Sequence, residues 1–272
     1  MSRQQIQFDH FKNLHFGQKA FVMPNAWDAG SAKLLAGMGF DALATTSAGY
    51  AYSQGKRDSC AELSRDELLA NASDIANAVA LPVSADLEGG FGHAPEDCAE
   101  TIRMAEEIGL VGGSIEDATG DSDAPIYGLH EAVDRIQAAA ETSAHLPFLL
   151  TARAENYLWG CPDLGDTIKR LQLYSDAGAD VLYAPGLPNL DAIRTVCREV
   201  DKPVNVLMGL SGPTYTVSDL SDAGVRRISV GGSFARAAFG ALRRAAEEVK
   251  SKGTFGYAAD AIPDAELSNL MK

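Results

Sequence analysis

Three acidic side chains follow two neighbouring apolar runs of the sequence. Asp86 and Glu88 stand one residue apart in SADLEGGFGH, and Glu116 ends the next run, in GGSIED. Carboxylates gathered at one place repel one another and raise one another's pKa, so a cation is expected among them. Magnesium prefers oxygen ligands and keeps several of its waters, so one acid would bind it directly and two through water. Salt bridges from neighbouring Arg or Lys side chains are the alternative.

An arginine and a hydroxyl-rich turn accompany these acids. Arg153 follows an apolar run in the segment TARAE. It is either a counter-ion of the acids or a fork for a substrate carboxylate, and we favour the substrate role because a metal would neutralise the acids. The segment TTSAG, residues 45–49, offers hydroxyl groups and a small-residue turn whose backbone N–H groups could bind an anion. An ordinary Ser/Thr-rich turn would look the same.

Eight short apolar runs recur along the chain, and the polar groups above lie at the ends of four of them. Helical patterns with apolar residues three and four positions apart separate the runs, an arrangement typical of a parallel sheet covered on its outside. Eight strand–helix units predict a closed (β/α)8 TIM barrel, whose active site lies at the carboxyl ends of the strands. The predicted strands are 21–25, 42–47, 82–86, 113–117, 148–153, 181–185, 203–208 and 227–231.

An open, doubly wound sheet is the alternative fold. Such a sheet usually carries a Gly-rich phosphate loop after an early strand, and the sequence has neither G-x-G-x-x-G nor G-x-x-x-x-G-K-[ST]. We therefore predict one barrel domain spanning 1–272. An extra helix within 1–20 would cover the bottom of the barrel, the barrel would occupy 21–250, and 251–272 would form a C-terminal extension.

Helix capping could explain some of the polar residues at strand ends. Asp, Ser and Asn cap the helix that follows a strand, because their side chains accept hydrogen bonds from its first N–H groups. We favour this structural role for Asp28, Asp117 and Ser233. It explains the acidic trio poorly.

Composition narrows the classes of function. A net charge of -14 opposes binding to nucleic acid or to an anionic membrane surface. No apolar run approaches the length of a membrane span, and the polar N-terminus lacks a secretory signal, so a cytoplasmic protein is expected. Cys60, Cys98, Cys161 and Cys197 are far apart, as expected of reduced thiols, and the five histidines form no metal-binding motif.

Five segments in a fixed order resemble a known family. PNAWDAGSAKLL, TTSAGYAYSQGKRDS, DLEGGFG, GGSIED and TARAE, at the predicted strand ends, look like the isocitrate lyase and phosphoenolpyruvate mutase superfamily. The resemblance implies a (β/α)8 barrel that makes or breaks C–C or P–C bonds next to a 2-oxo acid, through an enolate stabilised by magnesium. It also implies a homo-oligomer, a dimer or a tetramer, in which the last helix is commonly swapped between neighbours.

The resemblance assigns the acids to metal binding and one further residue to catalysis. Asp86 resembles the direct metal ligand, and Glu88 and Glu116 resemble the acids that hold the metal through water. Magnesium is the implied cofactor, with manganese as the alternative. Asp58, in GKRDS, is similar to a mutase Asp that lies near the reacting group.

The resemblance assigns a second set of residues to the substrate. Ser47 and the amides of Ala48 and Gly49 look like the cradle for the carboxylate end of the oxo acid. Arg153 would grip the substrate from the other side and act in catalysis. Asn205 occupies a position similar to a substrate-facing Asn of the lyases.

Two family signatures are absent. Isocitrate and methylisocitrate lyases carry a K-[KR]-C-G-H loop after the fourth strand, whereas residues 116–136 here contain neither Cys nor Lys. The Lys and Asn that phosphoenolpyruvate mutases place in this loop are missing too. His93, Tyr183 and Tyr215 could supply a proton, although each is more often a wall residue.

These observations predict a magnesium-dependent lyase that cleaves a C–C bond in a small 2-oxo or 2-hydroxy carboxylic acid. Oxaloacetate decarboxylation would need the least from the missing loop residues, and a methylisocitrate lyase-like reaction is the other C–C candidate. A phosphoenolpyruvate or phosphonopyruvate mutase or hydrolase acting on a P–C bond is one alternative. A protein that binds 2-oxo acids without converting them is the other.

Overall fold

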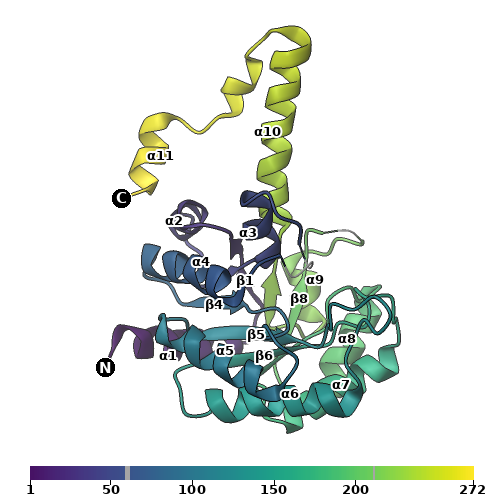
Figure 1. Cartoon of the computed structure of the whole chain (residues 1–272). Coiled ribbons are helices and arrows are strands. Elements are labelled where there is room, and N and C mark those ends of the chain that lie inside the picture. The colour runs from purple at the N-terminus through teal and green to yellow at the C-terminus, as the bar shows by residue number, and fades with distance from the viewer. Residues whose placement is uncertain (59–61, 211) are drawn as a thin grey trace.

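Short parallel strands alternate with helices along the chain and form one sheet (Figure 1). The computed structural model describes residues 1–58, 62–210 and 212–272, so Cys60 lies outside the described residues. The strand order is β1-β9-β8-β7-β6-β5-β4-β3-β2, and every pair is parallel. The strands are β1 Phe21–Met23, β2 Asn25–Ala26, β3 Leu43–Thr45, β4 Val83–Asp86, β5 Gly112–Glu116, β6 Leu149–Arg153, β7 Val181–Tyr183, β8 Val204–Leu207 and β9 Arg227–Ser229.

The first predicted strand closes the barrel by dividing in two. Its first half, β1, pairs with β9, and its second half, β2, pairs with β3. Pro24 separates the halves because it has no N–H for a ladder, while its carbonyl still accepts from the Ala44 N–H at 2.9 Å. The Asn25 side chain ties this seam together, since it accepts from the Val230 and Gly231 N–H groups and donates to the Thr45 carbonyl. The prediction of a (β/α)8 barrel is confirmed, although the run 21–25 forms two strands.

Helices cover the outside of the strands, and local sequence explains where they begin. Ser64 and Glu67 form a capping box at the start of α4, and Pro95 occupies the first turn of α5, where its missing N–H costs nothing. The helices are α1 Arg3–His15, α2 Ala29–Gly37, α3 Ser47–Ser53, α4 Arg65–Ala78, α5 Pro95–Glu107, α6 Leu129–Ser143, α7 Leu164–Asp176, α8 Leu190–Glu199, α9 Val217–Asp222, α10 Ser233–Lys252, the 3-10 helix η1 Gly256–Asp260 and α11 Asp264–Leu270.

Helix capping accounts for one of the three residues predicted to cap. Asp28 precedes α2 and accepts from the Ser31 N–H at 2.6 Å, so this prediction is confirmed. Ser233 is the first residue of α10, and Gly232 occupies the cap position, so the prediction for Ser233 is wrong. Asp117 caps no helix either, so the prediction for Asp117 is also wrong.

Helix α1 closes the amino-terminal end of the barrel. Phe11 and His15 are buried, and their rings stack edge-on at 4.7 Å, while His15 and Phe21 of β1 do so at 5.0 Å. Met23 and Leu149 complete this small apolar cluster. The cavity of the barrel therefore opens only toward the carboxyl ends of the strands, as far as the described residues show.

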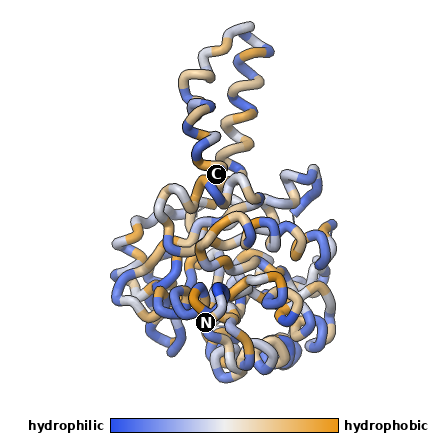
Figure 2. Tube along the Cα trace, turned by 90° about the vertical axis from the view of Figure 1, so that its left-hand side faces the viewer, coloured by the Kyte–Doolittle hydropathy of each residue, from blue (hydrophilic) through white to orange (hydrophobic). Residues whose placement is uncertain are grey.

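The last part of the chain projects from the barrel as an arm, formed by α10, η1 and α11 (Figure 1). Gly253 ends α10 in the left-handed conformation, at φ 66°, and the chain then returns toward α2. Figure 2 shows apolar residues along the projecting part, and Phe239, Leu242 and Phe255 are 41%, 64% and 65% exposed. None of the helices described here is long and apolar enough to cross a membrane.

His15 links α1 to the barrel interior as a neutral ring. Its Nδ1 lies 2.8 Å from the Phe11 carbonyl, which can only accept, so Nδ1 carries the proton and Nε2 accepts from Arg227 Nη1 at 3.4 Å. Burial, followed by the charge of Arg227, lowers the pKa of His15 to about 3, although the bond to Phe11 opposes this. The unfolded chain would protonate His15 near its ordinary pKa of 6.5.

This difference makes stability depend on pH. Below pH 6.5 the unfolded state binds a proton that folded His15 does not take up until about pH 3, so stability is lost as the pH falls through this window. We expect His15 to lower the free energy of unfolding by about 2 kcal/mol between pH 7.5 and pH 5. Urea denaturation of His15→Gln should show that much less pH dependence than the wild type.

His10→Gln is the matched control, because His10 lies on the same helix and is exposed. Its pH dependence should equal that of the wild type. An unchanged pH dependence in His15→Gln would show that His15 is not held neutral.

Candidate functional site

A cavity of about 370 Å³ opens at the carboxyl ends of the strands. The register places polar residues side by side around it: Glu116 pairs with Arg153, Arg153 with Tyr183, and Tyr183 with Asn205. Eight of the nine predicted site residues line this cavity, namely Ser47, Ala48, Asp58, Asp86, Glu88, Glu116, Arg153 and Asn205. The (β/α)8 fold therefore brings together residues that lie far apart in the sequence.

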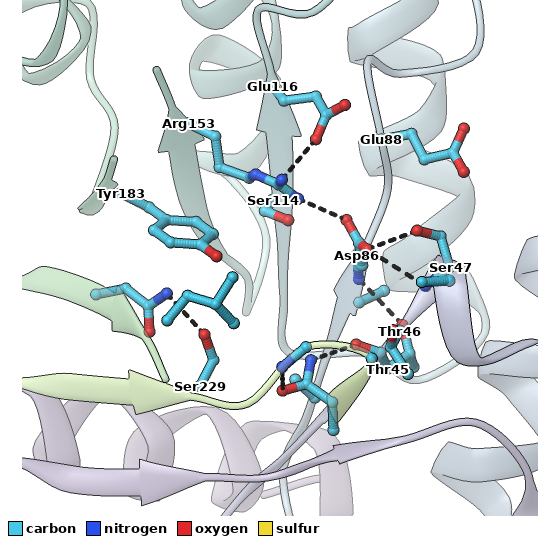
Figure 3. A pocket seen from close by; sticks show the side chains of 18 of the residues that line it. Thr45, Thr46, Ser47, Asp86, Glu88, Ser114, Glu116, Arg153, Tyr183 and Ser229 are labelled. Carbon is cyan, nitrogen blue, oxygen red and sulfur yellow. Dashed lines mark hydrogen bonds and ion pairs between the residues drawn. The ribbon is translucent and has the colours of Figure 1, made fainter. Parts of the chain in front are cut away.

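Arg153 is the centre of an ion-pair cluster (Figure 3). Its guanidinium lies 2.9 Å from Asp86 Oδ1, 2.9 Å from Glu116 Oε2 and 2.9 Å from Glu155 Oε1. Burial lowers the pKa of Arg153, but the three acids, with Glu116 first, raise it well above its usual range. The geometry thus matches the counter-ion alternative for Arg153, and one cation serves three carboxylates.

Glu88 lies beside this cluster and does not contact Arg153. Figure 3 shows its carboxylate pointing away from the guanidinium. Burial raises the pKa of Glu88 to about 7, and the charges of Asp86 and Asp58 add to this, while Arg153 opposes it. Burial also raises the pKa of Glu116 well above its ordinary value, even though Arg153 lies next to it. Arg153 therefore does not offset the cost of burying Glu88 and Glu116 as carboxylates.

The loop that carries Glu88 is held in an unusual backbone conformation. Glu88 and Phe91 have φ of 47° and 60°, and Gly90 has φ 82°, where a Cβ would meet Cys98 Sγ at 2.8 Å. The buried Arg135 donates to the carbonyls of Gly89 and His93 and so holds both ends of this loop. Gly90 of DLEGGFG is thus required by backbone geometry at the site.

The hydroxyl-rich turn contacts the acids directly. The Ser47 N–H and hydroxyl donate to Asp86 Oδ2 at 3.3 and 2.8 Å (Figure 3). Thr46 is the N-cap of α3 and accepts from the Gly49 N–H at 3.2 Å. Gly49 does not line the cavity as the structure describes it, and its N–H is already used by this cap.

Several residues of the site carry little sequence signal. Glu155 follows Arg153 by two positions and is buried in contact with it, although the sequence alone offered Arg153 as the chemical group. Ser229 and Arg227 lie within a strand, and only a charged residue inside an apolar run, in RRISVGG, could have indicated an inward-facing group. Of the three possible proton donors, Tyr183 lines the cavity, whereas His93 and Tyr215 line neighbouring ones.

The loop after β5 folds away from the cavity. Ala118 and Ile126 form an antiparallel bridge, and the Tyr127 N–H donates to the Asp117 carbonyl. Residues 117–128 are all described, and none of them lines this cavity. This is the loop that lacks the Cys and Lys of the family signature.

The donor set fits magnesium better than a metal that prefers nitrogen or sulfur. The oxygen groups around Asp86 are carboxylates and hydroxyls, and contacts with Ser47 and Arg153 use three of about four acceptor sites on the Asp86 carboxylate. No three His, Cys, Asp or Glu side chains of the described residues form a ready-made cage for a metal ion. An ion held by one carboxylate, waters and the surplus negative charge agrees with magnesium chemistry.

The fold and the site define a class: a (β/α)8 barrel whose carboxyl end presents an arginine among acids of neighbouring strands. A model of the family described as phosphoenolpyruvate phosphomutase matches residues 11–250. The chain belongs to this family, within the isocitrate lyase and phosphoenolpyruvate mutase superfamily.

Relatives of the chain support the same assignment. A candidate lyase/mutase of Burkholderia cenocepacia is 53% identical, with a TM-score of 0.95 over 98% of this chain and 96% of that one. An uncharacterized protein of Mycobacterium tuberculosis is 32% identical over 81% of both chains. The 2,3-dimethylmalate lyase of Eubacterium barkeri is 26% identical over 76% of this chain and 68% of its own. Other relatives include the 2-methylisocitrate lyase of Escherichia coli, which is 29% identical over 68% of this chain and 63% of its own.

Asp117 supports the site from below. It accepts from the Glu155 N–H at 2.7 Å, from Arg170 Nη1 at 2.9 Å and from the Tyr174 hydroxyl at 2.6 Å, and it is 2% exposed. The prediction that Asp117 caps a helix is wrong, because its side chain turns inward to hold the residue that follows β6 and the helix α7. It thereby fixes the position of Glu155.

Removal of this acid should destabilise the fold strongly. Asp117→Ala leaves Arg170 and the Tyr174 hydroxyl buried without their shared acceptor, and we expect a loss of about 3 kcal/mol in the free energy of unfolding. Asp166→Ala is the control, since Asp166 also pairs with Arg170 at 2.7 Å but its side chain is 36% exposed. It should lose less than about 1 kcal/mol. Equal losses by urea denaturation would contradict the special role of Asp117.

Proposed function

We propose that the protein is a magnesium-dependent lyase that cleaves a C–C bond in a small 2-oxo or 2-hydroxy carboxylic acid. One observation carries the proposal: among the described residues a single guanidinium, that of Arg153, faces Asp86, Glu116 and Glu155, and Glu88 lies in the same cavity. A site with this imbalance favours a divalent cation and a substrate that brings oxygen ligands to it.

The residues of the chain would divide the work. Asp86 would hold the metal directly, and Glu88 and Glu116 would hold it through water, with manganese as the alternative metal. When bound, magnesium would supply Lewis-acid stabilisation of negative charge on the substrate oxygen. Ser47 and Ala48 line the side of the cavity where the carboxylate of the substrate would lie, and Arg153 would bind it from the opposite side once a cation relieves it of the acids.

Oxaloacetate decarboxylation is the reaction that depends least on the missing loop residues. The bond between C3 and the distal carboxylate breaks, CO₂ leaves, and the electron pair moves toward the 2-oxo oxygen, where Arg153 opposes the charge. A proton must then reach C3. The Tyr183 hydroxyl lines the cavity, and burial raises its pKa, so it is protonated at neutral pH.

The similarity to 2,3-dimethylmalate lyase supports C–C chemistry. The family description and the position of Asp58 on the cavity favour the second candidate, a mutase or hydrolase of P–C bonds. The third candidate is a protein that binds 2-oxo acids without converting them. The absence of the catalytic Cys and Lys from the loop after β5 supports it.

A substrate panel separates these candidates. The purified protein is incubated with magnesium and with oxaloacetate, 2-methylisocitrate, isocitrate or phosphonopyruvate, and pyruvate, glyoxylate and phosphate are measured. We expect pyruvate from oxaloacetate. Phosphate or rearranged product from phosphonopyruvate would favour P–C chemistry, and oxalate binding without any turnover would favour the binder.

Asp86→Asn tests the metal assignment. It keeps the shape of the side chain but removes its charge, so magnesium-dependent oxalate binding, measured by calorimetry, should weaken by at least about a hundredfold. Asp191→Asn is the control, because the Asp191 side chain is 91% exposed and lies on α8, away from the cavity. Full magnesium-dependent binding in Asp86→Asn would remove the metal from this site.

We also propose that the protein is a homo-oligomer and that a second copy covers the arm. Phe239, Leu242 and Phe255 are large apolar side chains that the rest of their own described chain leaves exposed, and burying them gains free energy. The double variant Phe239→Glu/Leu242→Glu should shift the mass in light scattering toward the monomer. Phe16→Glu, at the end of α1, is the control and should keep the mass of the wild type; an unchanged mass in the double variant would contradict the proposal.

A further inference from the structure

The cavity has a second arginine at its inner end. Arg227 is the first residue of β9, so it lies deeper in the barrel than the strand ends, and it is 3% exposed. Its Nε donates to Asn205 Oδ1 at 3.0 Å, its Nη2 donates to Thr151 Oγ1 at 3.0 Å, and its Nη1 faces His15 Nε2 at 3.4 Å. All three partners are neutral.

No carboxylate contacts this guanidinium. Within residues 1–58, 62–210 and 212–272, no Asp or Glu oxygen lies within 4.0 Å of Arg227. Three of its five N–H groups have partners, which leaves two. Burial lowers the pKa of Arg227 to about 10, while Tyr183 raises it, so it is a cation at neutral pH. Buried charges are usually paired, and an unpaired one costs several kcal/mol.

Arg227 is the cationic side chain that the described lining of the cavity leaves for a second anionic group of a ligand. Among its described lining residues the Arg and Lys side chains are Arg153 and Arg227, and Arg153 already faces three acids. The loop residues at the mouth that come from β6 and β8, Leu158, Trp159 and Leu210, carry no charge. A carboxylate that enters the cavity can therefore be neutralised at its inner end.

The two arginines belong to one connected surface. Arg153 lies 5.0 Å from the centre of the Tyr183 ring, and the Tyr183 hydroxyl interacts with Ser229. Ser229 accepts from Asn205 Nδ2 at 3.0 Å, a bond drawn in Figure 3, and Asn205 accepts from Arg227. The amide of Asn205 is thus oriented by Arg227, with its oxygen toward the cation. A cavity of about 370 Å³ has room for a small ligand that touches both arginines.

We propose that Arg227 binds the second carboxylate of a dicarboxylate substrate whose 2-oxo or 2-hydroxy acid head lies among Arg153, Asp86 and Ser47. This inference rests on the proposed function, because it takes the head-group site from there, and it narrows the substrate class to dicarboxylates. Asn205 positions the guanidinium, and Ser229 lies beside it. Binding would convert an unpaired buried charge into an ion pair.

Two ligands with the same head separate the inner end from the rim. Malate and 2-hydroxybutyrate share the 2-hydroxy acid head and differ in a terminal carboxylate or methyl group, and oxalate is too short to leave the rim. Dissociation constants are measured by calorimetry in magnesium. We expect the wild type to bind malate at least about tenfold more tightly than 2-hydroxybutyrate. Arg227→Gln should abolish that preference and change oxalate binding by less than about threefold.

Asn205→Asp is the second variant, and it keeps Arg227 in place. It sets a carboxylate against Nε, so the guanidinium gains an internal partner and the preference for malate should vanish without loss of the fold. Arg227→Lys keeps the charge and should retain part of the preference. Far-UV circular dichroism and thermal melting report whether each variant is folded.

The outcomes separate this inference from the proposed function. A wild type without preference for malate, or an Arg227→Gln variant that keeps it, overturns the role of Arg227. Equal losses of oxalate and malate binding in a folded Arg227→Gln also overturn it, because a structural role would affect both. Failure of the wild type to bind oxalate overturns the proposed head-group site, and the comparison of malate with 2-hydroxybutyrate still measures the inner end.

Discussion

The pairing of one arginine, whose side chain is only 13% exposed, with three acids constrains the whole carboxyl end of the barrel. Arg153 meets Asp86, Glu116 and Glu155 within 2.9 Å, and these groups come from β4, β5 and the segment after β6. The strand register must hold all of them at one depth, and Asp117 and Arg135 hold the segments that follow. Burial raises the pKa of Glu116 well above its ordinary value although Arg153 lies next to it, so a further cation would stabilise the ionised acids.

The amino-terminal end of the barrel closes the same cavity from the other side. Helix α1 covers the amino-terminal side with Phe11 and His15, and His15 stays neutral because burial and then the charge of Arg227 lower its pKa. A polar chain through Asn205, Ser229 and Tyr183 then connects this inner arginine to the mouth. The interior is thus a polar channel between two guanidinium groups, and in the part of the chain that the structure describes it opens where the strands end.

The family to which the chain belongs agrees with the geometry of its cavity. The matched family is described as phosphoenolpyruvate phosphomutase, and this chain gathers its acids at the carboxyl end of the barrel, where the active sites of TIM-barrel enzymes lie. The loop after β5, which lacks the Cys and Lys of the family signature, folds back on itself, and none of residues 117–128 lines the cavity.

Apolar periodicity in the sequence predicted the barrel and the approximate positions of its strands, because periodicity is a local property. Residue types at the strand ends, together with the resemblance to the family, predicted eight residues that line the cavity. The sequence missed that 21–25 splits at Pro24, since a strand that pairs on two sides looks like any other apolar run. The sequence-based prediction for Asp117 was wrong, because an acid that follows a strand can either cap the next helix or pair with a buried arginine, here Arg170. Only the tertiary structure decided that Arg153 faces three acids and Arg227 faces none, because the distances between charges depend on how strands far apart in the chain come into register.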